Sequence, residues 1–101
     1  MIDDSGVQVW LDTVGSRPIA ITPYVQSEQP ATLRYRVEVS QRSQGSRSRI
    51  AQSGTVSVLS DVPAPLSRFS LSSRPDGECR IEVTLTSTDK KERRYVFDCP
   101  N

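Results

Sequence analysis

The stretch LRYRVEVS, residues 33–40, alternates apolar and polar side chains without interruption. Successive side chains of a β-strand point to opposite faces, so the apolar residues of this stretch would share one face and the polar residues the other. Such a period of two is typical of a strand with one buried and one solvated side. We find no stretch of eleven residues or more with a convincing helical stripe. We therefore predict an all-β protein.

Shorter runs with the same alternation lie on both sides of this stretch. They cover residues 7–12, 19–24, 47–52, 55–59, 68–71, 79–85 and 95–99. We expect residues 19–24 to form an edge strand or a bend, because Pro23 has no N–H to donate to a sheet. Residues 47–52 are the weakest of the predicted strands, since Ile50 is their only large apolar residue.

Turn-forming residues separate these runs. We interpret the polar residues 41–46 and the Ser-Arg-Pro-Asp-Gly sequence of residues 73–77 as turns, and the Pro-Ala-Pro of residues 63–65 as a crossing or loop. Seven or eight short strands at intervals of about ten to twelve residues are typical of an antiparallel β-sandwich of immunoglobulin or fibronectin type III kind. A small barrel is the alternative. Because 101 residues suit one hydrophobic core, we predict a single domain over residues 1–101.

The last two runs predict a hairpin with its turn near Asp89. If Cys79 lies opposite Cys99, the large apolar residues of both strands also become opposed on the core face: Ile81 with Phe97, and Val83 with Tyr95. Directly opposed residues have Cα atoms about 4.5–5.5 Å apart, a distance that a disulfide can span. A slip by one residue would place one sulfur in the core and the other in water. We therefore predict a Cys79–Cys99 disulfide, with two buried free thiols as the alternative.

Composition argues against several classes of function. Thirteen basic residues against twelve acidic ones leave a net charge of +1, which does not suit a surface built for nucleic acid. The chain has no long apolar run for membrane insertion. Histidine is absent, and with it the commonest general base and the commonest neutral metal ligand. The two cysteines lack partners for a zinc site, and no phosphate-binding loop occurs. We expect a binding module that is not an enzyme and needs no metal or cofactor.

The first residues carry a weak indication of compartment. Met1 to Asp4 show neither the basic nor the apolar region of a secretory signal. A disulfide is typical of an oxidising compartment. If the protein is exported, we expect this sequence to be its mature form.

Basic residues gather in two segments. Residues 34–49 hold five arginines against Glu38 alone, five minus one or +4, and residues 90–94 hold four basic residues against Glu92, four minus one or +3. The arginines of the first segment are Arg34, Arg36, Arg42, Arg47 and Arg49. In an immunoglobulin-like arrangement residues 47–52 would join the sheet of the terminal hairpin. Its outer face would then carry a group of mostly basic residues: Arg47, Arg49, Arg80, Thr84 and Arg94.

We expect Arg34 and Arg36 to project from the other sheet. Outward arginines commonly keep sheet faces soluble and edge strands unpaired. Gathered together, they would also speed the encounter with an acidic partner. This hypothesis requires that the arginines lie together and are not paired off with neighbouring carboxylates.

The chain resembles a known family over roughly residues 7–99. The resemblance is clearest in four segments, residues 33–39, 54–56, 66–69 and 79–83. Together they resemble the CsgC-like curli accessory proteins, most closely the CsgH branch. The resemblance implies a small, monomeric periplasmic domain that keeps secreted amyloid subunits from nucleating fibres before export. Its implied partner is an acidic curli-type subunit, unfolded or prefibrillar. The Cys-x-Cys pair of the CsgC branch is absent here, so the resemblance does not extend to a redox role.

Two other kinds of binding module remain alternatives. One is an adhesion or scaffolding module of a bacterial envelope complex, which would bind a folded partner stably. The other is a carbohydrate-binding sandwich, in which an exposed Trp10 or Tyr24 would form the platform for a sugar ring. Buried rings at these two positions would argue against the second alternative.

Overall fold

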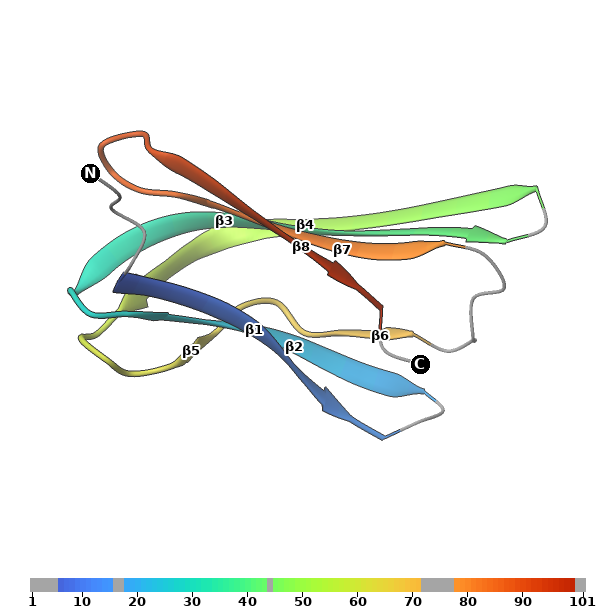
Figure 1. Ribbon diagram of the computed structural model, residues 1–101, viewed down its shortest axis with the longest axis horizontal. Helices are drawn as coiled ribbons and strands as arrows, with labels where there is room; N and C mark the ends of the chain where they lie inside the picture. Colours follow the sequence, from blue (N-terminus) through green and yellow to red (C-terminus); the bar gives the residue numbers. More distant parts are fainter. Residues whose placement is uncertain (1–5, 16–17, 44, 72–77, 100–101) are drawn as a thin grey trace.

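The computed structural model describes residues 6–15, 18–43, 45–71 and 78–99, which form eight strands (Figure 1). The strands are β1 (Val7–Val14), β2 (Ile19–Ser27), β3 (Ala31–Ser43), β4 (Ser46–Val58), β5 (Ala64–Pro65), β6 (Phe69–Leu71), β7 (Cys79–Thr86) and β8 (Glu92–Asp98). The turn predicted at residues 73–77 lies outside the described residues.

The strands form two sheets that lie one above the other (Figure 1). One sheet has the order β1-β2-β5, with β6 also paired to β2, and the other has the order β4-β3-β7-β8. All pairings between these strands are antiparallel. The predicted β-sandwich of seven or eight strands is therefore confirmed. Neither sheet closes on itself, so the small barrel is excluded.

The core fills the space between the two sheets. It is built from the apolar residues of the alternating runs: Ile21, Val25, Leu33, Val37, Val39, Val58, Leu66, Phe69, Leu71, Ile81, Val83 and Leu85. These residues face inward because each strand contributes every second side chain to the same side of its sheet. The prediction that the apolar residues of the stretch 33–40 face the core is confirmed, with Tyr35 half-buried at its margin.

Pro23 lies in a central strand, so the prediction of an edge strand or a bend for residues 19–24 was wrong. β2 pairs with β1 along its whole length on one side. On its other side β6 pairs with residues 19–21 and β5 with residues 24–25. The carbonyl of Pro23 accepts a hydrogen bond from the Leu66 N–H (2.8 Å), so the backbone of Pro23 faces this second side. The missing N–H therefore falls in the gap between two short strands, where no ladder bond is lost.

β4 is one continuous strand, although we predicted two strands, residues 47–52 and 55–59. The predicted turn at residues 41–46 was also too long, since β3 and β4 pair as far as Ser43 and Ser46. The register runs without a bulge over thirteen pairs. Its length follows from β3, whose strong alternation supplies a complete template for a strand that is itself weakly patterned.

The terminal hairpin has the predicted register. Ile81 lies opposite Phe97 and Val83 opposite Tyr95. The disulfide Cys79–Cys99 is present, with a Cα–Cα distance of 5.4 Å, so the prediction of a bond rather than free thiols is confirmed. At the turn the Ser87 hydroxyl donates a hydrogen bond to the Asp89 carboxylate, which lowers the pKa of Asp89 below its ordinary value.

Gly54 in β4 leaves room for the ring of Tyr35 on the neighbouring strand. A Cβ at position 54 would lie 2.9 Å from the Tyr35 hydroxyl and 3.1 Å from its ring carbon Cζ. The ring cannot swing away freely, because its hydroxyl hydrogen-bonds the Ser67 hydroxyl at 3.1 Å. We expect Gly54→Ala to lower the free energy of unfolding by about 1–3 kcal/mol, the usual cost of overpacking.

Urea denaturation would measure this loss. The reverse change at an exposed position of the same strand, Ala51→Gly, would measure the backbone entropy difference between Gly and Ala, which acts with the opposite sign in Gly54→Ala. In the double variant Gly54→Ala/Tyr35→Phe the hydroxyl is gone, and we expect part of the stability to return. A Gly54→Ala protein as stable as the parent would contradict the close approach.

Candidate functional site

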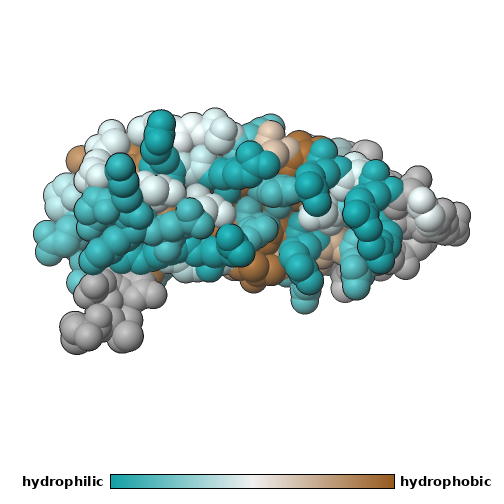
Figure 2. Space-filling view, turned by 90° about the horizontal axis from the view of Figure 1, so that it is seen from above, coloured by the Kyte–Doolittle hydropathy of each residue, from teal (hydrophilic) through white to brown (hydrophobic). Residues whose placement is uncertain are grey.

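The outer face of the β4-β3-β7-β8 sheet is strongly hydrophilic (Figure 2). The register places one row of polar residues across all four strands, Arg49, Ser40, Arg80 and Asp98, and a second row contains Arg36, Thr84 and Arg94. These residues face outward because their chain neighbours are the core residues of the same strands. We call this surface the basic face and define it by its seven arginines: Arg34, Arg36, Arg42, Arg47, Arg49, Arg80 and Arg94.

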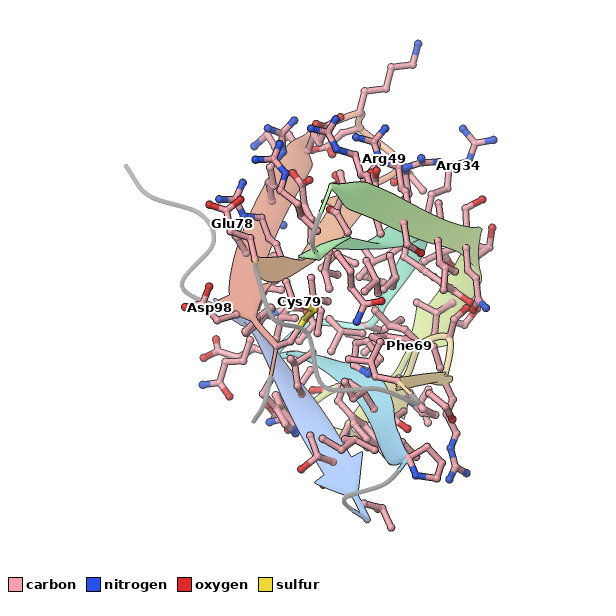
Figure 3. The ribbon with its side chains drawn as sticks, turned by 90° about the vertical axis from the view of Figure 1, so that its right-hand side faces the viewer. Arg34, Arg49, Phe69, Glu78, Cys79 and Asp98 are labelled. Carbon is pink, nitrogen blue, oxygen red and sulfur yellow. A yellow bond between two sulfur atoms is a disulfide. The ribbon has the colours of Figure 1, made fainter. Side chains whose placement is uncertain are left out.

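Arg34 and Arg36 belong to the basic face, so their predicted place on the other sheet was wrong. β3 lies between β4 and β7 in the same sheet as the terminal hairpin. Arg34 lies opposite Thr55 of β4 and Arg36 opposite Thr84 of β7. Figure 3 shows Arg34 and Arg49 on the same side of the molecule, whereas Cys79 lies between the two sheets. The predicted grouping of Arg47, Arg49, Arg80, Thr84 and Arg94 on one outer face agrees with the register.

Carboxylates on the same face pair with three of the arginines. Arg49 Nε lies 2.8 Å from Glu38 Oε2, and Arg36 Nη2 lies 3.7 Å from Glu38 Oε1. Arg94 Nε lies 2.8 Å from Glu82 Oε2, and its Nη2 lies 3.8 Å from Glu92 Oε2. The requirement that the arginines are not paired off is therefore met only in part.

The other four arginines form no ion pair with any carboxylate in the described ranges. They are Arg34, Arg42, Arg47 and Arg80. The outward register positions of the four strands hold the seven arginines against Glu38, Glu82, Glu92 and Asp98, seven minus four or +3. Exposed ion pairs contribute only about 0–1 kcal/mol each, so the paired guanidinium groups can exchange a carboxylate for another anion at little cost.

A hollow of about 470 Å³ lies at the end of the basic face nearest the β3–β4 turn. Four arginines, two carboxylates and both disulfide cysteines are among the residues that line it: Ser40, Gln41, Arg42, Arg47, Arg49, Glu78, Cys79, Arg80, Asp98 and Cys99. Arg42 lies directly opposite Arg47, a like-charge pair that destabilises a sheet unless an anion lies nearby. Arg42 belongs to the basic segment 34–49, but it was not among the predicted site residues. The alternation that places Arg34 and Arg36 on one face, extended past Ser40, would have included it.

The second basic segment, residues 90–94, does not form one patch. Arg94 lies on the basic face, whereas Arg93 lies opposite the core residue Leu85 and is half-buried. Lys90 and Lys91 are exposed in the turn between β7 and β8, where Lys91 Nζ lies 4.0 Å from Asp89 Oδ2. Only one of the four basic residues of this segment thus contributes to the basic face.

Trp10 and Tyr24 lie on the outer face of the other sheet. They are opposed in the β1–β2 register, and their rings are stacked with centroids 5.8 Å apart and planes inclined by 8°. Both rings are half-buried. They are neither the exposed platform nor the buried rings that would decide for or against carbohydrate binding.

Among the described residues, no cluster of three or more His, Cys, Asp or Glu side chains is arranged so that it could hold a metal ion. Among the same residues, no helix has the length and apolarity needed to cross a membrane.

Fold and surface together define a small antiparallel β-sandwich with one basic sheet face. Two solved structures share this fold. The E. coli curli protein CsgC has a TM-score of 0.75 and 22% identity over 90% of this chain and 97% of its own. The solution structure of R. palustris CsgH has a TM-score of 0.72 and 13% identity over 91% of each chain. No curated protein matches the chain.

The family model described as "Thin aggregative fimbriae synthesis protein" (Tafi-CsgC) matches residues 4–91. The chain therefore belongs to the thin aggregative fimbriae synthesis protein family, as the resemblance implied.

Proposed function

We propose that this protein works in the periplasm as a chaperone-like inhibitor of fibre nucleation by a curli-type amyloid subunit. Membership of a family named for fimbriae synthesis supports a role in curli assembly. The likeness in fold to the curli protein CsgC supports the same role. The observation that carries the mechanism is the gathering of seven arginines on one sheet face.

The basic face suits brief contacts with an acidic, unfolded or prefibrillar chain. Exposed guanidinium groups attract carboxylates over about a Debye length, 8–10 Å at physiological salt, and so raise the rate of encounter. They bury little apolar surface, and exposed ion pairs are weak, so each contact ends quickly. An inhibitor of this kind acts on the sparse early assemblies of a fibre and needs no tight complex with the monomer.

The residues proposed to contact the subunit are the arginines of the basic face. They comprise the six that the sequence singled out, Arg34, Arg36, Arg47, Arg49, Arg80 and Arg94, together with Arg42. Arg47 and Arg80 are the most informative to change, because they line the hollow and form no ion pair with a described carboxylate. Replacing both arginines by Glu reverses their charge. Because neither pairs with a described carboxylate, the change frees no such carboxylate.

We expect Arg47→Glu/Arg80→Glu to raise the dose needed for half-inhibition of fibre formation about tenfold at low salt. The two reversals together would cost about 1.4 kcal/mol of contact energy, which is a factor of ten. The assay is thioflavin fluorescence during fibre growth of a curli-type subunit, with the protein present at substoichiometric amounts.

The matched control is Arg68→Glu/Lys90→Glu, which changes the net charge by the same amount. Both of its residues are exposed and lie off the basic face. We expect it to inhibit like the parent. Inhibition by Arg47→Glu/Arg80→Glu that equals that of the parent at low salt would contradict the electrostatic mechanism. An equal loss in both double variants would show that net charge, and not the basic face, is responsible. Stable, saturable binding to a folded partner, without any effect on fibre formation, would favour an adhesion or scaffolding module.

A further inference from the structure

The outer edge of β4 has no partner strand among the described residues. β4 is the last strand of its sheet, and it pairs with β3 alone over thirteen residues. It contains no proline, and its register has no bulge. A long, regular, open edge is a template on which another extended chain can pair.

The backbone groups that face this edge can be identified. The Arg42 N–H donates to the Glu78 carbonyl at 2.8 Å, so even-numbered residues of β3 direct their N–H and C=O groups toward β7. In an antiparallel ladder their partners on β4 direct the same groups away from β3. The register names these partners: Arg47, Arg49, Ala51, Ser53, Thr55 and Ser57.

The usual protection of an open edge is confined to one end of β4. Arg47 and Arg49 carry its only charges, and residues 50–58 are uncharged. β8, the opposite edge of the same sheet, holds charged residues at its first three positions and at its last: Glu92, Arg93, Arg94 and Asp98. Charged side chains discourage edge pairing. Of the two edges of this sheet, β4 is therefore the one open to an added strand.

The side chains along β4 indicate what an added strand would carry. Arg47 and Arg49 project on the basic face, so residues opposite them would be acidic. Ile50 projects on the inner side of the sheet, where it is 43% exposed although its partner Val39 is buried at 3%. An apolar residue opposite Ile50 would cover it. Acidic and apolar residues would therefore alternate, as the pleat requires.

We propose that the β4 edge binds an extended polypeptide segment of alternating acidic and apolar residues as an added antiparallel or parallel strand. This inference rests on the proposed function, because it names the surface that would hold the fibre subunit. The arginines bring the acidic segment to the edge, and the edge-facing backbone groups of residues 47–55 then pair with it. A subunit strand held in this way has one of its two edges covered, so a further fibre strand can add to it only at the other edge.

Ser53→Pro tests the proposal with a nine-residue peptide of alternating Asp and Val as the probe. Ser53 lies in the uncharged half of β4, and its N–H faces the open edge, so a proline there keeps the β3–β4 ladder but obstructs an added strand. We expect the peptide to bind at least about tenfold more weakly, a loss of about 1.4 kcal/mol.

The matched control is a proline on the edge of the other sheet. The Glu28 N–H donates to the Gly6 carbonyl at 2.9 Å, so even-numbered residues of β1 face β2 and Thr13 faces the outside. We expect Thr13→Pro to bind the peptide like the parent. Equal binding by Ser53→Pro and the parent would overturn the proposal.

Amide hydrogen exchange in the unaltered protein gives a second test that needs no variant. On addition of the peptide we expect the amides of Ala51, Ser53 and Thr55 to exchange at least about tenfold more slowly. Those of Gln52 and Gly54 already face β3, and we expect little change in them. Peptide binding without this alternating pattern would overturn the proposal. The same protection without peptide, increasing with protein concentration, would show a second copy as the occupant and would also overturn it.

The two proposals can fail separately. If Ser53→Pro inhibits fibre formation like the parent and the edge amides are not protected, the proposed function holds but the β4 edge is not its binding surface. If the peptide binds at the β4 edge but the protein does not delay fibre formation, the edge proposal holds and the proposed function is contradicted.

Discussion

Loss of the Cys79–Cys99 disulfide is expected to lower the free energy of unfolding by about 2–5 kcal/mol. The two cysteines are 20 residues apart in the sequence, and their bond closes the terminal hairpin across β7 and β8. Closing a loop of that size lowers the conformational entropy of the unfolded chain, which stabilises the folded state by roughly 3 kcal/mol. Urea denaturation of the parent and of Cys79→Ala/Cys99→Ala would measure the difference.

The same loss should follow when the parent protein is reduced, and intact-mass measurement would verify that two hydrogen atoms have been gained. Agreement between the reduced parent and the double variant would separate the effect of the bond from that of the substitutions. A denaturation midpoint that stays the same after verified reduction would contradict a stabilising role for the bond.

Ile81→Ala is expected to cost about 2–5 kcal/mol, the usual range for large-to-small changes in a core. Ile81 is 0% exposed and lies in the middle of its sheet, between Val39 of β3 and Phe97 of β8. Small domains have about 5–15 kcal/mol of stability in total, so this single cavity would remove a large part of it. The loss would appear as a lower urea midpoint with an unchanged slope.

Val96→Ala serves as the control, since Val96 is 54% exposed on the outward side of the adjacent strand. We expect its effect to stay within about 0.5 kcal/mol. Similar losses in the two variants would mean that the core does not lie on the side of the sheet that the register indicates.

The terminal hairpin could be predicted from the sequence down to its register. Both of its strands alternate strongly, and the two cysteines restrict the choice further. A shift by one residue would have exposed either Ile81 or Phe97 and separated the sulfurs. The stretch 33–40 was predictable for the same reason, because its apolar residues all recur at a period of two. In both cases local pattern and tertiary packing favour the same conformation.

β4 and β2 show where local pattern is insufficient. The first half of β4 has one large apolar residue, Ile50, so its sequence alone does not reveal that pairing with β3 continues for thirteen residues. Pro23 indicated an edge or a bend. A central strand accommodates it because its neighbours β5 and β6 leave a gap beside it, a feature of the tertiary arrangement.

Six of the seven arginines of the candidate site could be predicted from the sequence, but the sheet to which Arg34 and Arg36 belong could not. Alternation placed each arginine on the outward side of its own strand, and this part agrees with the structure. Which strands share a sheet depends on chain topology, which an immunoglobulin-like template represented incorrectly for β3. Arg34 and Arg36 were therefore assigned to the wrong side of the molecule. The ion pair of Glu38 with Arg49 could not be foreseen either, because it joins two neighbouring strands whose register was unknown, whereas the pair of Glu38 with Arg36 lies within β3.

Trp10 is the only tryptophan in the chain, and it lies on β1, in the sheet opposite to the arginines. Its emission therefore reports on unfolding of the sandwich and on its contact with Tyr24, and it lies on the sheet opposite to the basic face. A titration followed by this intrinsic fluorophore can thus distinguish a ligand that merely docks from one that denatures the protein, without an attached dye.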